Sequence, residues 1–442
     1  MEPTFKTRRQ FLKTGVLGGA LGWTVPSFLA RTFNSLATEA ANKTQPSTGK
    51  DSPILVVLQL AGGNDGLNTI VPFNNDLYYK ARPSIAIPQG KVLKLNDEFG
   101  LHPAMSGFKE LYDAGQMGII HGVGYPNPNR SHFRSTEIWQ TASDSNKYER
   151  HGWLGRYFDN ACKGADPTVG INIGKQMPQA FASGKPVGIS LENPEKYRIS
   201  NSGSRGEGEM EGKDSMFEKM NEMDENGDEL NSGSSISSLS GETPPESRSL
   251  DYLERVALDA QISSELILKI SRSSKNEVTY PPSQLANSLK LVARLIGGGI
   301  STRVFYVSHG GYDTHTNQAL SHERLLKDLA GAVNAFMSEI KLQKNGDRVL
   351  LMTFSEFGRR VAQNANKGTD HGAAAPLFLF GNKVKAGING KFPSLVTKNL
   401  HNGDLKFNVD FRSVYAGILE QWLSAKSDPI LNGKFEPYQI VG

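Results

Sequence analysis

The sequence contains a single cysteine, Cys162, among its 442 residues. This excludes an internal disulfide and a zinc site built from a cysteine cluster, so any metal ion would be held by histidine and carboxylate side chains. The net charge of +4 is small and no basic stripe with interleaved aromatic residues occurs, so we expect no nucleic-acid partner. The hydrophobic share of 38% is somewhat low, which indicates a polar insertion that dilutes an ordinary core.

The amino-terminal residues resemble a twin-arginine export signal. Residues 7–15, TRRQFLKTG, precede a modestly apolar run that is rich in glycine and alanine and contains Pro26. A transmembrane helix needs about 20 strongly apolar residues, so this run predicts no stable membrane anchor, and no lipobox cysteine follows it. We therefore expect residues 1–41 to be a signal peptide read by the twin-arginine translocase, residues 42–52 to be a linker, and the protein to be periplasmic or extracellular.

Short apolar runs alternate with amphipathic segments along the rest of the chain. The first run, ILVVLQL, is typical of a strand that is covered on both faces. Further strands are expected at 117–121, 303–307, 349–354 and around 378–380, and amphipathic helices at 282–296, 320–342 and 410–423. Strands that alternate with helices predict an α/β fold over residues 53–442, with a doubly wound, mostly parallel sheet and helices on both faces.

Residues 201–247 differ in composition from the rest of the predicted domain. They are rich in serine, glycine and glutamate, with twelve acidic residues against three basic ones. Such a composition cannot bury a core, so we expect a disordered low-complexity insertion or a mobile lid. A calcium loop at 224–235 is rejected because Glu229 and Ser235 stand where such a loop requires glycine and glutamate.

Chemically active side chains follow several of the expected strands. Asn64 and Asp65 follow the first strand, Asp313 and His315 follow the strand at 303–307, and Glu356 follows the strand at 349–354. Ligands in an open α/β sheet bind beyond the carboxyl ends of the strands, so we expect these side chains to converge. Mixed histidine and carboxylate sites suit zinc, manganese and similar divalent ions, although each loop taken singly is equally typical of an ordinary polar turn.

Two further segments add to this candidate site. Asp370 and His371 form a turn before the strand around 378–380. Ser131 lies between Arg130 and His132 at an expected helix start, where backbone N–H groups favour an anion. A serine at that position is commonly an N-cap, but a nucleophile that accepts a phosphoryl or sulfuryl group would lie there too.

Five segments form a specific combination with the twin-arginine leader: LQLAGGNDGLNT, GYPNPNRSHFRSTEIW, HGGYDTHTNQ, TFSEFGRR and GTDHGAAAP. Together they resemble the bacterial family called domain of unknown function 1501. That family resembles the alkaline phosphatase and sulfatase superfamily, whose members hold one or two divalent metals over a nucleophile at a helix start. The resemblance implies an alkaline phosphatase-like fold with Ser131 at the nucleophile position and Asp65 as the carboxylate after the first strand.

The same resemblance implies an Asp/His metal pair at Asp313 and His315 and a late metal-binding histidine at His371. Glu356 falls where the superfamily has an Asp-His pair, and Phe357 follows it. Asp313 and His315 lie two residues apart, whereas the phosphatases have a wider spacing.

These observations predict an exported metal-dependent hydrolase of phosphate or sulfate esters, acting on a small-molecule or glycan ester. Ser131 would attack the ester, Arg130 would neutralise its charge, and His132 is a lesser catalytic candidate. The predicted ligands of the metal, which would be zinc, manganese or calcium, are Asp65, Asp313, His315, Glu356, Asp370 and His371. The alternative is a non-catalytic, remodelled member of the superfamily that acts as a periplasmic binding or partner protein.

Overall fold

The computed structural model describes residues 51–163, 165–184, 187–191 and 267–442. The predicted signal peptide, most of the predicted linker and the acidic insertion at 201–247 lie outside these residues. The strands of the main sheet are β1 (Ile54–Leu60), β5 (Met117–Gly124), β6 (Gly170–Ile173), β7 (Ile189–Leu191), β8 (Val304–His309), β9 (Val349–Phe354), β10 (Ala375–Phe380), β11 (Gly387–Asn389) and β12 (Val409–Asp410). A small second sheet contains β2 (Ile70–Val71), β3 (Leu93–Lys94) and β4 (Gly100–Leu101).

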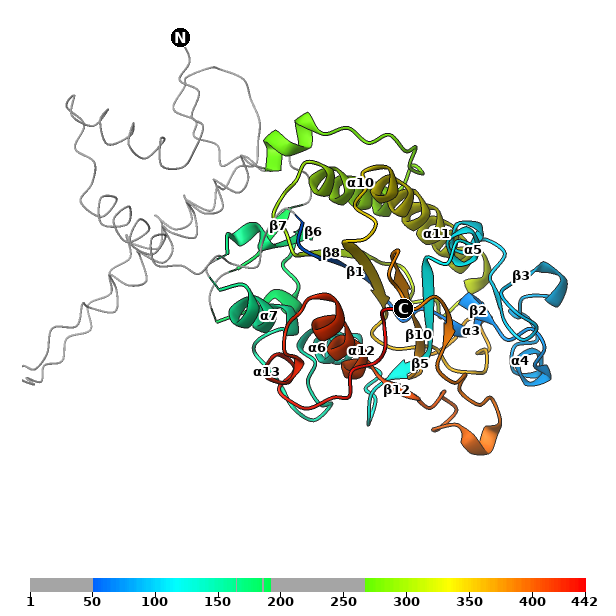
Figure 1. The fold of residues 1–442 in the computed structure, drawn as a ribbon. Coiled ribbons are helices and arrows are strands. Elements are labelled where there is room, and N and C mark those ends of the chain that lie inside the picture. The colour runs from blue at the N-terminus through cyan, green and yellow to red at the C-terminus, as the bar shows by residue number, and fades with distance from the viewer. Residues whose placement is uncertain (1–50, 164, 185–186, 192–266) are drawn as a thin grey trace, which may run out of the picture. The chain divides into compact units, whose positions relative to one another are not determined.

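The main sheet has the order β11-β5-β10-β9-β1-β8-β6-β7, and β12 also pairs with β5 (Figure 1). β1 runs parallel to β8 and β9, and β6 runs parallel to β7 and β8. β10 is antiparallel to both β9 and β5, whereas β11 and β12 run parallel to β5. The structure therefore confirms the predicted mostly parallel α/β sheet, and the reversal of β10 places its amino-terminal end beside the carboxyl ends of β5 and β9.

Helices connect and cover these strands (Figure 1). The α-helices are α3 (Gly66–Thr69), α4 (Asp76–Ala81), α5 (Ser106–Asp113), α6 (His132–Thr141), α7 (Trp153–Ala161), α10 (Gln284–Gly297), α11 (Gln318–Leu342), α12 (Phe411–Gly417) and α13 (Ser427–Leu431). The short 3-10 helices are η2 (Gln89–Lys91), η3 (Pro167–Val169), η4 (Gln179–Phe181) and η5 (Thr397–Asn399), and η6 (Ile418–Trp422) is a π-helical turn. None of the helices in the described ranges is long and apolar enough to cross a membrane.

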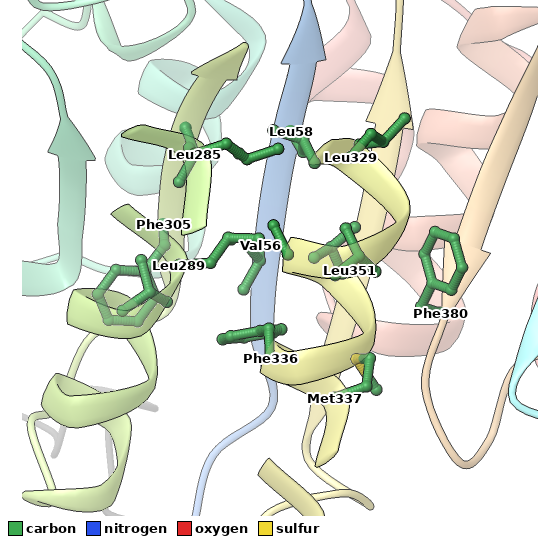
Figure 2. Close-up of a cluster of buried hydrophobic side chains, with 14 of the residues drawn as sticks. Val56, Leu58, Leu285, Leu289, Phe305, Leu329, Phe336, Met337, Leu351 and Phe380 are labelled. Atoms are coloured by element: carbon green, nitrogen blue, oxygen red, sulfur yellow. The ribbon is translucent and has the colours of Figure 1, made fainter. Parts of the chain in front are cut away.

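Both faces of the sheet are buried, which explains why its central strands are apolar without alternation. Val56 and Leu58 of β1 face a core shared with α5, α10 and α11, whereas Leu55 and Val57 face a second core shared with α6, α7, α12 and α13. Figure 2 shows the first core, in which Leu289 of α10 and Leu329 and Phe336 of α11 pack over the sheet. Burying one such side chain stabilises the fold by roughly 1.5–3 kcal/mol.

The predicted helices agree with the structure except at the carboxyl-terminal end. The segments expected at 282–296 and 320–342 correspond to α10 and α11. The segment expected as one helix over 410–423 divides into α12 and the π-helical turn η6. Asp410 caps α12, because its side chain accepts a hydrogen bond from the backbone N–H of Arg412.

Candidate metal centre

Three loops meet at the edge where β5, β8 and β9 end. Asp313 and His315 lie in the loop between β8 and α11, and His132 is the first residue of α6, which follows β5. Glu356 and His371 lie in the loop between β9 and β10, and the reversed direction of β10 keeps this loop at the same edge. The structure therefore brings side chains from distant parts of the chain together at the edge where the sequence places the site.

Three histidines surround the carboxylate of Asp313. The Nε2 atoms of His315 and His371 lie 3.0 and 3.1 Å from its Oδ1 atom, and they are 2.9 Å from each other. The Nε2 atom of His132 lies 3.5 Å from its Oδ2 atom. The potential ligand atoms of His132, Asp313 and His371 all lie within 4.8 Å of one another. His315 contacts two members of this group of three, Asp313 and His371, so four side chains with metal-binding chemistry lie near one another.

Two of these rings are oriented by acceptors on their far side. Nδ1 of His371 lies 2.8 Å from the backbone oxygen of Arg130, and Nδ1 of His315 lies 3.2 Å from a carboxylate oxygen of Asp370. A hydrogen bond from Asn364, with a smaller contribution from His315, lowers the pKa of Asp370, so that it accepts as a carboxylate. Because both partners accept hydrogen bonds, Nδ1 of each ring donates on the far side, and Nε2 is the ring atom that faces Asp313 and could bind a metal ion.

The ring of His132 also has an acceptor at Nδ1, and its Nε2 atom lacks a hydrogen-bond partner. Its Nδ1 atom lies 2.9 Å from Oε1 of Glu356, a side chain that is only 2% exposed and also accepts the backbone N–H of Gly62 at 2.8 Å. Its Nε2 atom is buried and has no hydrogen-bond partner among the described residues. A buried polar atom without a partner is unfavourable in a native structure, and here it points toward Asp313. This nitrogen needs a partner that the chain does not supply.

The donor set fits a divalent transition-metal ion. Imidazole nitrogens and a carboxylate are ligands that zinc accepts, and manganese also tolerates them. Calcium, the third predicted ion, takes oxygen ligands, so a site with three nitrogens does not suit it. Each ring is also held by an acceptor behind it, which is the usual way in which proteins fix the tautomer of a metal-binding histidine.

Arg359 fixes the position of the carboxylate at the centre. Its guanidinium is fully buried and donates to Oδ1 of Asp313 at 2.7 Å, as well as to the backbone oxygens of Gly62, Gly63 and Thr369. Partial burial raises the pKa of Asp313, but the hydrogen bond and the positive charge of Arg359 outweigh this and hold it at about 2. Asp313 is therefore ionised throughout the neutral range. Arg359 was not among the predicted site residues, and its signal in the sequence is the arginine pair in EFGRR after β9.

Several predicted site residues lie beside the cluster rather than in it. Glu356 and Asp370 were predicted as ligands, but the structure uses them to orient His132 and His315. The side chain of Arg130 pairs with Asp404, and only its backbone oxygen reaches His371. Ser131 is exposed at the N-cap position of α6, and its hydroxyl makes no capping hydrogen bond.

Asp65 is placed apart from the cluster, in a buried network. Its carboxylate pairs with Arg82 at 2.5 Å, with neither side chain exposed, and accepts from Gln318 at 2.6 Å and from the backbone N–H of Leu67 at 3.2 Å. Burial raises the pKa of Asp65, but the charge and hydrogen bond of Arg82, helped by Gln318, lower it below its usual value. With its oxygens engaged in this way, Asp65 anchors the loop after β1 and is not positioned as a ligand.

Replacing Arg82 with methionine is expected to lower the free energy of unfolding by about 3 to 5 kcal/mol, because Asp65 would remain as a buried, unpaired charge. The folded-state pKa of Asp65 is depressed, so the pair stabilises the wild type above the unfolded pKa, and this contribution is lost as the pH falls. The difference in the free energy of unfolding between wild type and variant should therefore be larger at neutral than at acidic pH. Urea unfolding at both pH values measures this difference.

The control for this experiment is the double variant Asp65→Asn with Arg82→Met. Removing the carboxylate's charge should restore part of the lost stability, as expected for two groups coupled in a buried pair. Equal urea midpoints for the wild type and the single variant would contradict the assigned role of this ion pair.

Comparison with known proteins gives one family and several distant structures. The family model described as "Protein of unknown function (DUF1501)" matches residues 53–426. No curated protein sequence matches the chain. The PsFucS1 sulfatase from Pseudoalteromonas sp. is 11% identical, with a TM-score of 0.32, and the match covers 84% of this chain and 70% of that one.

Two further solved structures belong to the same comparison. The lipoteichoic acid synthase LtaP from Listeria monocytogenes is 8% identical, with a TM-score of 0.34, over 90% of this chain and 79% of that one. A protein in the alkaline phosphatase superfamily from Vibrio parahaemolyticus is 9% identical, with a TM-score of 0.31, over 79% of this chain and 65% of that one. All three TM-scores are below 0.5, so the fold assignment rests on the sheet and helices described above.

Proposed function

We propose that this chain, which belongs to the DUF1501 family of proteins of unknown function, is a metal-dependent hydrolase of phosphate or sulfate esters. The observation that carries the proposal is the convergence of three histidine Nε2 atoms on Asp313, each ring held by an acceptor at Nδ1. His132, Asp313, His315 and His371 would hold the ion. A bound divalent ion supplies a Lewis acid that stabilises negative charge on ester oxygens.

Ser131 is the nucleophile in this proposal. It directly precedes His132 at the start of the ten-residue helix α6, where unpaired backbone N–H groups favour the charge of an ester oxyanion. Its hydroxyl is exposed and makes no capping hydrogen bond, so attack would not disturb the helix. The serine oxygen would bond to phosphorus or sulfur while the bond to the leaving alcohol breaks, and the serine proton would end on that alcohol. Water would then release phosphate or sulfate and regenerate the hydroxyl.

The acceptors behind the histidines have a defined part in this scheme. Glu356 and Asp370 hold the protons at the Nδ1 atoms of His132 and His315, so that the Nε2 atoms stay available as ligands. Arg359 holds Asp313 in place and keeps it ionised. We further propose that the protein acts after twin-arginine export, on a small-molecule or glycan ester outside the cytoplasm.

The direct test is to measure metal content and ester hydrolysis on the same purified protein. We expect at least one equivalent of zinc or manganese by elemental analysis, and hydrolysis of 4-nitrophenyl phosphate or 4-nitrophenyl sulfate that is lost with a chelator and restored by the metal. Absence of both metal and hydrolysis would contradict the proposed function.

One outcome of this test favours the second candidate function, a non-catalytic metal-binding protein. Glu356, at the position of the superfamily's Asp-His pair, is used to orient His132. Among the described residues, one cluster of potential ligands is found. Stoichiometric metal without hydrolysis of any aryl ester would therefore support a remodelled binding protein.

A further inference from the structure

A pair of arginines beside the metal centre shares one buried carboxylate. Asp404 has no exposed surface, and its Oδ2 atom accepts from Nε of Arg130 at 2.9 Å and also from Nη2 of the same guanidinium. Nε of Arg360 lies 3.4 Å from Oδ1 of Asp404, and its Nη2 donates to the backbone oxygen of Asn402 at 2.7 Å. Both arginine side chains are 38% exposed, so the pair is held by a buried carboxylate but remains accessible to solvent.

Both arginines are tied through their backbones to the loop that carries His371. The backbone oxygen of Arg130 accepts from Nδ1 of His371 at 2.8 Å. The backbone N–H of Arg360 donates to the backbone oxygen of Asp370 at 3.0 Å. The backbone of each arginine therefore contacts the segment that carries His371, next to the candidate metal centre.

The carboxylate of Asp404 balances one of the two guanidinium groups, and Arg360 also interacts with the charge of Asp370. Because Asp370 is exposed, solvent screens its charge, and both guanidinium groups can still attract an anion. Among the described residues, the Nη1 group of neither Arg130 nor Arg360 makes a hydrogen bond to the protein. One arginine would be enough for an ion pair with Asp404 that only links two loops. Two arginines are present, and each has N–H groups that are free to bind a ligand.

We propose that Arg130 and Arg360 form a subsite for a second oxyanion of the substrate. Guanidinium groups bind carboxylate, phosphate and sulfate through paired N–H donors, and these two groups offer such donors beside the proposed ester site. The inference rests on the proposed function and narrows its substrate class to esters that carry a further acidic group, such as an acidic sugar or a molecule with two phosphate or sulfate groups. Arg130 thus binds a remote charge and does not neutralise the reacting group.

Non-hydrolysable ligands test this subsite without relying on turnover. The probes are phenylphosphonate and its 3-carboxy and 4-carboxy derivatives, titrated calorimetrically into metal-loaded protein. We expect at least one carboxylated probe to bind about tenfold more tightly than phenylphosphonate, the gain that about 1.4 kcal/mol provides. Arg360→Gln should remove this gain and leave the affinity for phenylphosphonate unchanged.

Two matched variants keep the test specific. Arg360→Lys retains the charge but not the planar fork, so it should restore part of the gain. Lys367→Gln removes an exposed positive charge from the same loop and should leave the gain intact. Thermal unfolding of each variant reports whether Asp404 still holds the loops together.

The outcomes separate the two proposals. If phenylphosphonate itself does not bind to metal-loaded protein, the proposed function fails. If it binds but neither carboxylated probe binds more tightly, or if the gain survives Arg360→Gln, the subsite is overturned and the arginine pair is only a structural link between loops.

Discussion

Replacing Ser131 with alanine is expected to lower kcat for aryl ester hydrolysis by at least about 1000-fold, as removal of a nucleophile does in other hydrolases. The metal content should not change, because the ligands assigned to the ion are the three histidines and Asp313. The fold should not change either, since the hydroxyl makes no capping hydrogen bond and the backbone N–H of Ser131 keeps its 2.8 Å bond to Asn129. Steady-state kinetics on metal-loaded protein measure the effect.

The control lies on the same helix. Thr136→Ala removes a hydroxyl from α6 that is partly exposed and lies one turn further from the proposed nucleophile, so it should retain wild-type kcat. A covalent intermediate gives a second readout. Acid-quenched wild-type protein should carry a phosphoryl or sulfuryl group on the peptide that contains Ser131, and the alanine variant should not. Turnover in the variant within about tenfold of wild type would exclude Ser131 as the nucleophile.

The fold was largely predictable because its strands are buried on both faces. The runs that form β1 and β9 are apolar without alternation, and this follows from the helix layers on either side. The direction of β10 was not predictable, because an apolar run has the same composition in either direction. That direction decides whether His371 lies at the edge of the site or at the opposite edge.

The location of the site was easier to predict than the role of each residue. Asp313, His315 and His371 were predicted as ligands, and the structure brings their ligand atoms together. Sequence spacing does not tell whether a carboxylate contacts the metal or the far side of a histidine ring. In the structure Nε2 of His132 faces Asp313, and Glu356 contacts Nδ1 on the far side of the ring.

Asp65 illustrates a second limit of sequence reasoning. Its position after β1, together with the resemblance of the sequence to a metal-binding superfamily, suggested a ligand. Its partner Arg82 lies 17 residues further along, and Gln318 comes from the start of a distant helix. Neither contact follows a local pattern, so only the folded chain shows that the carboxylate is already engaged.

Replacing Asp313 with asparagine is expected to reduce the affinity for zinc or manganese by more than about 100-fold. Losing an orienting partner of a metal-binding histidine alone costs about 10- to 100-fold, and this change removes the charge at the centre of the cluster. The same carboxylate oxygen lies 3.0 and 3.1 Å from two histidine nitrogens, so the substitution removes a negative charge that faces both of them. Competition with a chromophoric chelator measures the affinity.

A graded series makes this prediction specific to the assigned geometry. Glu356→Gln keeps the shape of the side chain but weakens its hold on Nδ1 of His132, so it should cost about 10- to 100-fold and lie between Asp313→Asn and the wild type. Asp97→Asn, at an exposed position, should have no effect. The reverse order, with Glu356→Gln more damaging than Asp313→Asn, would return Glu356 to the role of a ligand and place Asp313 behind the histidines.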